Sequence, residues 1–297
     1  MKARFVLGLS FAALALLAGA ASAQRGGARE TPPVALSRIA GNVYLVSGGG
    51  GANATALVGD DGVLLVDSKL DEASGKAVAA ALAEITDGPV RFLLNTHVHP
   101  DHTGGNAVFG RAGAVIVGHE EVRTILAAGQ RGGPPAPPEA LPAMTFGDGA
   151  GVTLHLNGEE VRVRHVSPAH TADNSIVHYV SANVFHLGDV YSPSRYPVLA
   201  GGTLQGFIDD VDAVLRLADA DSRFVPGSGA VGGMAELRAY REMLVTVRDR
   251  VSALVAEGKS LDEVLAAKPT AGFDETWGSP DSRLFLPVVY AQLAGRD

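Results

Sequence analysis

The 297-residue chain contains no cysteine, and its basic residues are fewer than its acidic ones, 24 against 32. Without cysteine the protein forms no disulfide bond and offers no thiolate ligand to a metal. The formal net charge of −8 argues against nucleic acid as a partner, because affinity for nucleic acid depends on lysine and arginine side chains that face phosphates. The glycine-rich stretch SGGGGAN (residues 47–53) lacks the Lys-Ser/Thr ending of a P-loop, so we interpret it as a flexible turn.

The apolar run at the N-terminus is typical of a secretory signal peptide. Lys2 and Arg4 precede the run FVLGLSFAALALLAGA, and the small residues ASA lie just before Gln24. The run is short for a membrane span and has no second flank, so we expect cleavage, no stable membrane insertion, and a periplasmic or secreted protein. Removal of residues 1–23 leaves 274 residues with a formal charge of −10. We predict a single domain over residues 24–297, with a flexible start over 24–37.

Three histidines and an aspartate lie within six positions of the segment NTHVHPDHTGG, residues 95–105. A neutral imidazole and a carboxylate each offer a lone pair to a metal, and Zn²⁺ accepts such ligands in open, roughly tetrahedral sites. The apolar run VRFLLN predicts a buried strand, whose extended geometry would place His97 and His99 on the same side. Pro100 cannot continue a central strand, so the chain turns there and can bring Asp101 and His102 back from another direction. A polar turn with incidental histidines would explain one or two of these residues, but not four.

The predicted elements fall into two halves, each with strands followed by a helix. Strands are predicted at residues 42–46, 55–58, 63–66, 152–156, 161–166, 176–180 and 184–187. Helices are predicted from Asp71 and over 204–218, and C-terminal helices over about 234–297 begin with a long amphipathic one. Residues 128–145 are rich in Gly and Pro and are predicted to form a surface loop at the rim of the site. This order favours a layered α/β sandwich.

The His-x-His-x-Asp-His pattern resembles the first metal-binding motif of the metallo-β-lactamase superfamily. The stretch SPAHTADNS places His170 where that family has its third-motif histidine, and HLGDVYS places Asp189 where it has a bridging aspartate. FVPGSGAVGG resembles the family's Pro-Gly-His-Gly turn, but Ser228 stands where the family has a histidine. The resemblance spans about residues 38–232 and implies a four-layer αββα sandwich. The absence of cysteine excludes the subclasses that use a cysteine at the second metal.

The resemblance further implies a zinc-dependent hydrolase acting on a small molecule. The implied ligands are His97, His99 and His170 for the first zinc, and Asp101, His102 and the bridging Asp189 for the second. Because a serine hydroxyl is a weaker ligand than imidazole, we expect one tightly held zinc and one weaker. Zinc-bound water, with its pKa lowered to about 7, would attack the carbonyl of an ester, lactone, thioester or β-lactam amide. Asp101 would orient this nucleophile and pass its proton to the leaving group. No oligomeric state is predicted.

Two other functions stay open at this point. A mononuclear iron enzyme of the persulfide dioxygenase kind shares the superfamily fold and would use two histidines and a carboxylate, available as His97, His170 and Asp189. The substitution at Ser228 also allows a binding protein with a decayed metal site, although the other motif positions keep metal-binding residue types. A nuclease of the same superfamily is disfavoured by the acidic charge and the export signal.

Several further polar residues have both a structural and a functional interpretation. Asp67 ends the run GVLLVDS, where it either orients a histidine ligand or forms a plain turn. His119 and Tyr196 are candidates, with Ser228, for contacts to the second metal or the substrate, although helix capping is favoured for His119 and packing for Tyr196. His186 lies on the opposite strand face from Asp189 by parity, which argues against one shared metal. The histidines expected to be structural are His155, His165 and His178.

Overall fold

The first sheet contains seven strands in the order in which they occur along the chain. The computed structural model describes residues 32–280 and 285–295. The strands are β1 (Ala35–Ala40), β2 (Val43–Ser47), β3 (Ala54–Gly59), β4 (Gly62–Val66), β5 (Val90–Leu94), β6 (Val115–His119) and β7 (Met144–Phe146). Strands β1 to β4 pair antiparallel, whereas β4 to β7 pair in parallel. Parallel neighbours need crossovers, and these contain α1 (Glu72–Ala83), α2 (Pro100–Thr103), α3 (Asn106–Arg111) and α4 (Glu120–Ala128).

The second sheet has five strands in the order β12-β11-β10-β9-β8. The strands are β8 (Gly151–Leu156), β9 (Glu159–His165), β10 (Ser175–Tyr179), β11 (Val184–Gly188) and β12 (Arg223–Pro226). Neighbours from β8 to β11 are antiparallel, and β11 pairs in parallel with β12 through a crossover that contains α5 (Leu204–Leu217). The C-terminal helices are α6 (Met234–Ala256), α7 (Leu261–Ala266), α8 (Asp274–Trp277) and α9 (Leu286–Leu293).

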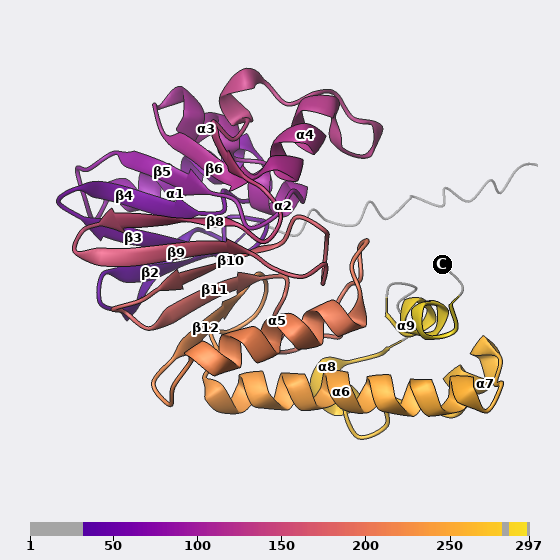
Figure 1. Ribbon diagram of the computed structural model, residues 1–297. Helices are drawn as coiled ribbons and strands as arrows, with labels where there is room; N and C mark the ends of the chain where they lie inside the picture. The colour runs from indigo at the N-terminus through magenta and orange to yellow at the C-terminus, as the bar shows by residue number, and fades with distance from the viewer. Residues whose placement is uncertain (1–31, 281–284, 296–297) are drawn as a thin grey trace, which may run out of the picture. The chain divides into compact units, whose positions relative to one another are not determined.

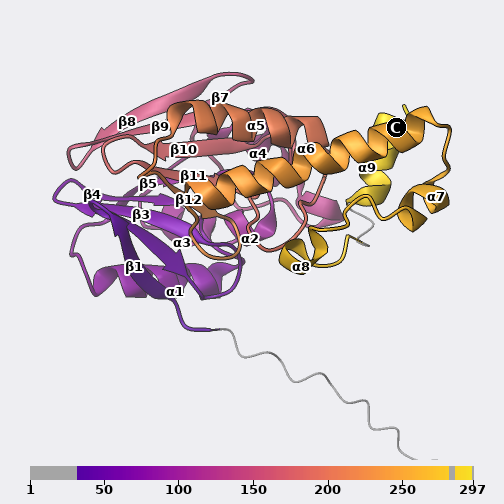
Figure 2. The same cartoon turned by 90° about the horizontal axis from the view of Figure 1, so that it is seen from below.

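Three apolar clusters separate four layers of secondary structure. Alternate residues of β4 face opposite ways: Leu65 packs with Leu82 of α1, and Leu64 packs with Val177 of the second sheet. On the far face of the second sheet, Phe185 packs with residues of α5 and α6, which lie side by side along that sheet (Figure 1). Figure 2 shows the same order from below, with α1 and α5 on opposite sides of the two sheets. The four-layer αββα sandwich expected from the sequence is confirmed.

The structure differs from the sequence-based boundaries at several short elements. Strand β1 begins at Ala35, inside the predicted flexible start, and the short strand β12 was absent from the predicted set. The loop 128–145 contains two 3₁₀ turns and the first residues of β7. These elements are short or mostly exposed, so they carry little hydrophobic periodicity to detect.

The described residues belong to one compact unit. Within residues 32–280 and 285–295, none of the helices combines the length and the apolar character that crossing a membrane requires. The proposed signal peptide and its cleavage position lie outside the described residues.

Candidate metal centre

The histidine segment follows directly from the carboxyl end of β5, where the parallel strands of the first sheet also end. His97 is buried, and His99 occupies the position before α2, with Pro100 as the first residue of that helix. Proline is favoured there because its fixed φ suits a helix start, where its missing N–H is not needed. The short helix then carries Asp101 and His102 back toward the strand end. The Nε2 of His97 lies 3.1 Å from the Nδ1 of His99.

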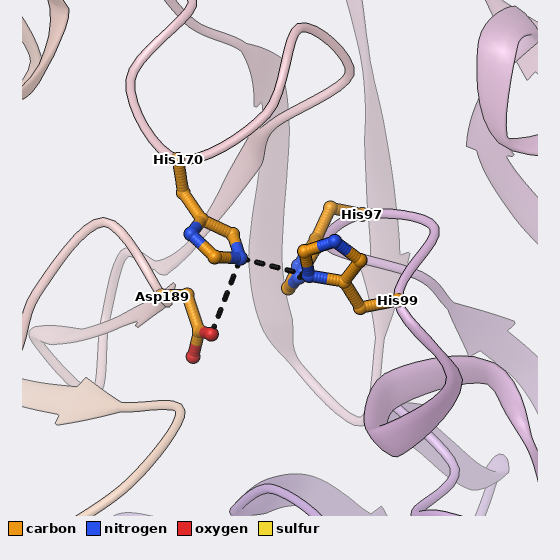
Figure 3. Close-up of side chains that lie close together, drawn as sticks. All are labelled: His97, His99, His170 and Asp189. Atoms are coloured by element: carbon orange, nitrogen blue, oxygen red, sulfur yellow. Dashed lines mark hydrogen bonds and ion pairs between the residues drawn. The ribbon is translucent and has the colours of Figure 1, made fainter. Parts of the chain in front are cut away.

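Two later segments bring a third imidazole and a carboxylate to the same point. His170 lies in the loop between β9 and β10, and its Nε2 is 2.8 Å from His99 Nδ1. Asp189 follows β11, and its Oδ2 lies 3.4 Å from His170 Nε2. The side chains therefore point toward one another from three separate parts of the chain, as Figure 3 shows.

The donor atoms of this group fit a metal ion. The ligand atoms of His97, His99, His170 and Asp189 all lie within 4.8 Å of one another. A tetrahedral zinc with Zn–N of about 2.0–2.1 Å sets its ligand atoms ~3.3 Å apart, close to the separations seen here. Burial lowers the pKa of His97 and of His170, which keeps each imidazole neutral with a lone pair to offer. The set contains the nitrogen and oxygen donors that zinc and iron both accept.

A second set of donors adjoins the first through Asp189. The Nε2 of His102 lies 3.5 Å from Asp189 Oδ1 and 3.7 Å from Asp101 Oδ2. This nitrogen is buried and has no hydrogen-bond partner among the described residues, so a cation held between His102, Asp101 and Asp189 would satisfy it. Burial alone would lower the pKa of His102, but the Asp67 and Asp189 carboxylates raise it well above its usual value. A metal at His102 therefore displaces a proton.

Asp67 makes contact with a histidine of the second set, which decides between the two interpretations of this residue. It is fully buried, and its carboxylate accepts hydrogen bonds from the Thr96 N–H and Oγ1, each at 2.8 Å. Its Oδ2 also lies 2.7 Å from His102 Nδ1. Because Thr96 Oγ1 donates its proton to Asp67, it accepts a hydrogen bond from His97 Nδ1 at 3.1 Å. The proton of the neutral His97 ring therefore lies on Nδ1, and Nε2 carries the lone pair.

The fully buried His186 supports Asp67 from between the two sheets. Its Nε2 is 3.6 Å from Asp67 Oδ2, and its Nδ1 is 3.0 Å from Thr55 Oγ1. Burial raises the pKa of Asp67, but His102 and His186 outweigh that effect and hold the carboxyl ionised. His186 thus contacts the residue that orients His102.

The glycine-rich turn after β2 is tied to both halves of the centre, a role that its composition did not reveal. The Ala52 N–H donates to Asp101 O at 3.0 Å, and the Asn53 N–H donates to Gly227 O at 2.7 Å. The buried Lys69 ammonium donates to two carbonyls at the ends of this turn, those of Val46 and Ala52. Burial lowers the pKa of Lys69 to about 8, against the opposing effect of Asp67. The turn therefore bridges the histidine segment and the loop after β12.

Ser228 lies in that loop, but its side chain is exposed. No hydrogen bond or ion pair joins it to the histidines among the described residues. The preceding Gly227 is the residue that packs against the centre, because a Cβ at this position would come within 2.1 Å of Asp189 Oδ1. The structure therefore brings the backbone of the turn to Asp189.

The structure does not bring Tyr196 or His119 to the cluster. The Tyr196 hydroxyl donates to Asp274 at 2.8 Å, and its ring stacks on Phe285, as expected for a packing residue. His119 caps α4 by accepting from the Glu121 N–H, in line with the favoured interpretation, although it is buried rather than on the surface.

His119 also stacks on His165, with Asp148 beside both rings. Although this group has three potential ligands, each Nδ1 accepts a backbone N–H, which assigns the proton to Nε2 in both neutral rings. His165 Nε2 donates to Ala172 O at 2.8 Å. The two rings therefore present N–H groups toward Asp148 rather than lone pairs for a metal.

The chain is similar to several known proteins. The family model of the metallo-beta-lactamase superfamily matches residues 47–249. The chain is 25% identical over 198 residues to the 2,4-dinitroanisole O-demethylase subunit alpha of Nocardioides sp. (strain JS1661), a match that covers 66% of this chain and 58% of that relative. The chain thus spans less than two thirds of that relative's length.

Two solved structures show the same fold at low sequence identity. A metallo-beta-lactamase from Pontibacter korlensis aligns with a TM-score of 0.61 at 19% identity, over 71% of this chain and 99% of that one. A double mutant of the sec-alkyl sulfatase PisA1 aligns with a TM-score of 0.70 at 16% identity, over 89% of this chain and 50% of that one.

Proposed function

The chain belongs to the metallo-beta-lactamase superfamily, and from that premise we propose that it is a zinc-dependent hydrolase of a small-molecule ester, lactone, thioester or β-lactam amide. Most members of this superfamily are hydrolytic enzymes, and its fold usually binds metal. The acidic composition and the N-terminal apolar run support a further proposal, that the enzyme works in the periplasm or outside the cell and does not bind nucleic acid.

One observation carries the proposal: two donor sets share Asp189. His170 Nε2 lies 3.4 Å from one oxygen of this carboxylate, and His102 Nε2 lies 3.5 Å from the other. Two-metal hydrolytic sites place their ions about 3.5–4 Å apart on such bridging groups. The His102 Nε2, which is buried and has no hydrogen-bond partner within the described part of the chain, supports a second cation beside the first.

The residues of the centre have different chemical roles, which follow from their positions. Zinc ions bound at these donors would supply Lewis acidity and lower the pKa of water to about 7. His102 Nδ1 contacts the Asp67 carboxylate, and His170 Nδ1 donates to the Val198 carbonyl. In both histidines Nε2 therefore faces the centre. Asp101 is half-exposed and stands at the open side, where its carboxylate can take a proton and deliver it to a leaving group.

The loop 128–145 is proposed to shape the substrate rim. Gln130 Nε2 donates to Val98 O, the residue between the first two histidines, so this loop is tied directly to the histidine segment. One relative is named for O-demethylation of 2,4-dinitroanisole, and one structural neighbour is a sec-alkyl sulfatase. Both compound classes therefore belong in a substrate panel beside carbonyl compounds.

A second candidate function uses one iron ion and oxygen. The group His97, His99, His170 and Asp189 includes two histidines and a carboxylate, His97, His170 and Asp189, that match the ligand set of non-haem iron oxygenases. Position 228 is a serine, so the second donor set has one imidazole fewer than the family pattern. This candidate predicts that protein produced with both metals retains iron and consumes oxygen.

The test is a panel assay on protein loaded separately with zinc and with iron. The panel contains esters, lactones, thioesters, β-lactams, 2,4-dinitroanisole and a sec-alkyl sulfate. Hydrolysis by the zinc form that disappears in His170→Ala, but persists in the matched control Asp148→Ala of the second histidine group, is the expected result. Oxygen uptake by the iron form, with no hydrolysis of any compound by the zinc form, would replace the hydrolase with the second candidate.

A further inference from the structure

The loop between Asp189 and α5 contacts His170 on the side away from the metal donors. Val198 O accepts a hydrogen bond from His170 Nδ1 at 2.7 Å, and the Ala200 N–H donates to His170 O at 2.8 Å. The first contact assigns the proton to Nδ1, so Nε2 carries the lone pair that faces His99. The position of this loop therefore decides where His170 points.

Helix α8 holds the near end of the loop. The Trp277 indole N–H donates to Ser192 O at 3.2 Å, and the Trp277 carbonyl accepts from the Tyr196 N–H at 3.2 Å. The Tyr196 hydroxyl adds a bond to Asp274 at 2.8 Å, and its ring stacks on the fully buried Phe285. Three hydrogen bonds from one short helix thus fix residues 192–196.

Helix α9 holds the far end of the same loop. The Gln292 side chain donates to Gly202 O at 2.8 Å and accepts from the Leu204 N–H at 3.3 Å. One amide therefore satisfies two backbone groups where the loop enters α5. The family match ends at residue 249, so Trp277 and Gln292 both lie in the C-terminal segment beyond it.

We propose that this C-terminal segment is part of the metal centre, with Trp277 and Gln292 as positioning residues for His170. They clamp the loop at both ends, so that Val198 O stays within hydrogen-bond distance of His170 Nδ1. A loop released at either end would let this carbonyl move away, and His170 would lose both its fixed tautomer and its orientation. The inference rests on the proposed function, because it requires that His170 binds a metal.

The test compares zinc affinity in variants that release the loop with a variant that only weakens the C-terminal core. Trp277→Phe removes the indole N–H but keeps an aromatic ring, and Gln292→Leu removes both amide contacts while keeping a side chain of similar size. Val264→Ala is the matched control, because Val264 is fully buried in the same apolar cluster but belongs to α7. Affinity is measured by competition with a chromophoric chelator, and folding by circular dichroism.

We expect the double variant Trp277→Phe/Gln292→Leu to lose about 10-fold or more in zinc affinity, the usual effect of removing support for a ligand. The cobalt-loaded form should show an altered visible spectrum, because His170 sits differently in the coordination sphere. Val264→Ala should change the melting temperature but leave both readouts as in the natural protein. If the double variant does not fold, Tyr196→Phe removes the hydroxyl contacts to Asp274 and Thr270 and should shift affinity and spectrum in the same direction to a smaller extent.

Each outcome has a defined meaning. Natural protein that binds zinc tightly, with loop variants that melt earlier but keep the same affinity and cobalt spectrum, would overturn the inference and leave the proposed function standing. Natural protein that binds neither zinc nor cobalt would overturn both. Equal loss of affinity in Val264→Ala would also count against the inference, because general weakening of the C-terminal core would then suffice.

Discussion

Asp210 is a buried carboxyl whose ionisation should destabilise the fold in a pH-dependent way. It lies on α5 at 2% exposure, and its Oδ1 accepts from the Ser167 N–H, in the loop that carries His170. Its Oδ2 is buried and has no hydrogen-bond partner among residues 32–280 and 285–295. Burial raises the pKa of Asp210 from 3.8 to about 7, although the bond from Ser167 opposes this shift.

The sign and size of the effect follow from the difference between folded and unfolded pKa. Between pH 3.8 and about 7 the folded state holds a proton that the unfolded chain has released, so stability falls as pH rises through this window. At 1.36 kcal/mol per pKa unit, ionisation costs the folded state about 4 kcal/mol at pH 8. At pH 5 the loss of stability relative to low pH is smaller, about 2 kcal/mol.

The substitution Asp210→Asn keeps an acceptor for Ser167 and removes the charge. The variant should therefore gain stability over the natural protein by about 2–3 kcal/mol more at pH 8 than at pH 5. Any cost of an unpartnered amide appears at both pH values and cancels in this comparison. Urea unfolding, followed by the fluorescence of the single tryptophan, measures both free energies. The exposed Asp87, changed to Asn, is the control. A difference between Asp210→Asn and the natural protein that stays constant with pH would refute the reasoning.

Four further predictions concern the centre and the N-terminus. His170→Ala should abolish retention of the tight zinc and activity together, and activity that survived would contradict the assigned ligands. Asp67→Asn should weaken zinc binding about 10- to 100-fold, measured by chelator competition, because His102 and Thr96 lose their charged acceptor. Ser228→His should tighten the second, weaker zinc, whereas two equally tight zincs in the natural protein would show that a histidine at this position is not needed. The exported protein should begin near Gln24, and N-terminal sequencing that found an intact Met1 would count against cleavage.

The histidine segment could be interpreted from sequence because its geometry is local. An apolar strand that runs into His-Val-His, followed by a proline, already limits where His97, His99 and His102 can point. The structure adds that Pro100 starts a short helix, so Asp101 and His102 return on its first turn. His170 and Asp189 required the family resemblance, because no local rule joins them to residues some 70 to 90 positions earlier in the chain.

The apolar runs of β4 and β11 were sufficient to predict these strands, and the period of two along a strand also put His186 on the opposite face from Asp189. Short elements such as β12 were missed for the opposite reason. Four residues flanked by turns hold too little periodicity, and the pairing of β12 with β11 supplies most of what defines it. The contacts of Trp277 and Gln292 with the loop between Asp189 and α5 could not be predicted from sequence either. A single tryptophan and a single glutamine form no pattern of spacing.

By itself, the sequence determined the fold class and predicted the donor residues and the order in which they arrive, because each depends on residue type, periodicity or a short motif. Only the tertiary structure decided which interpretation of Asp67 holds, that Ser228 is exposed, that Tyr196 contacts Asp274, and how His170 is held. Those outcomes depend on hydrogen bonds between segments that the chain brings together only on folding, such as Asp67 with His102 and Val198 with His170. A side chain's direction toward a distant partner is set by the packing of whole layers, which no local pattern records.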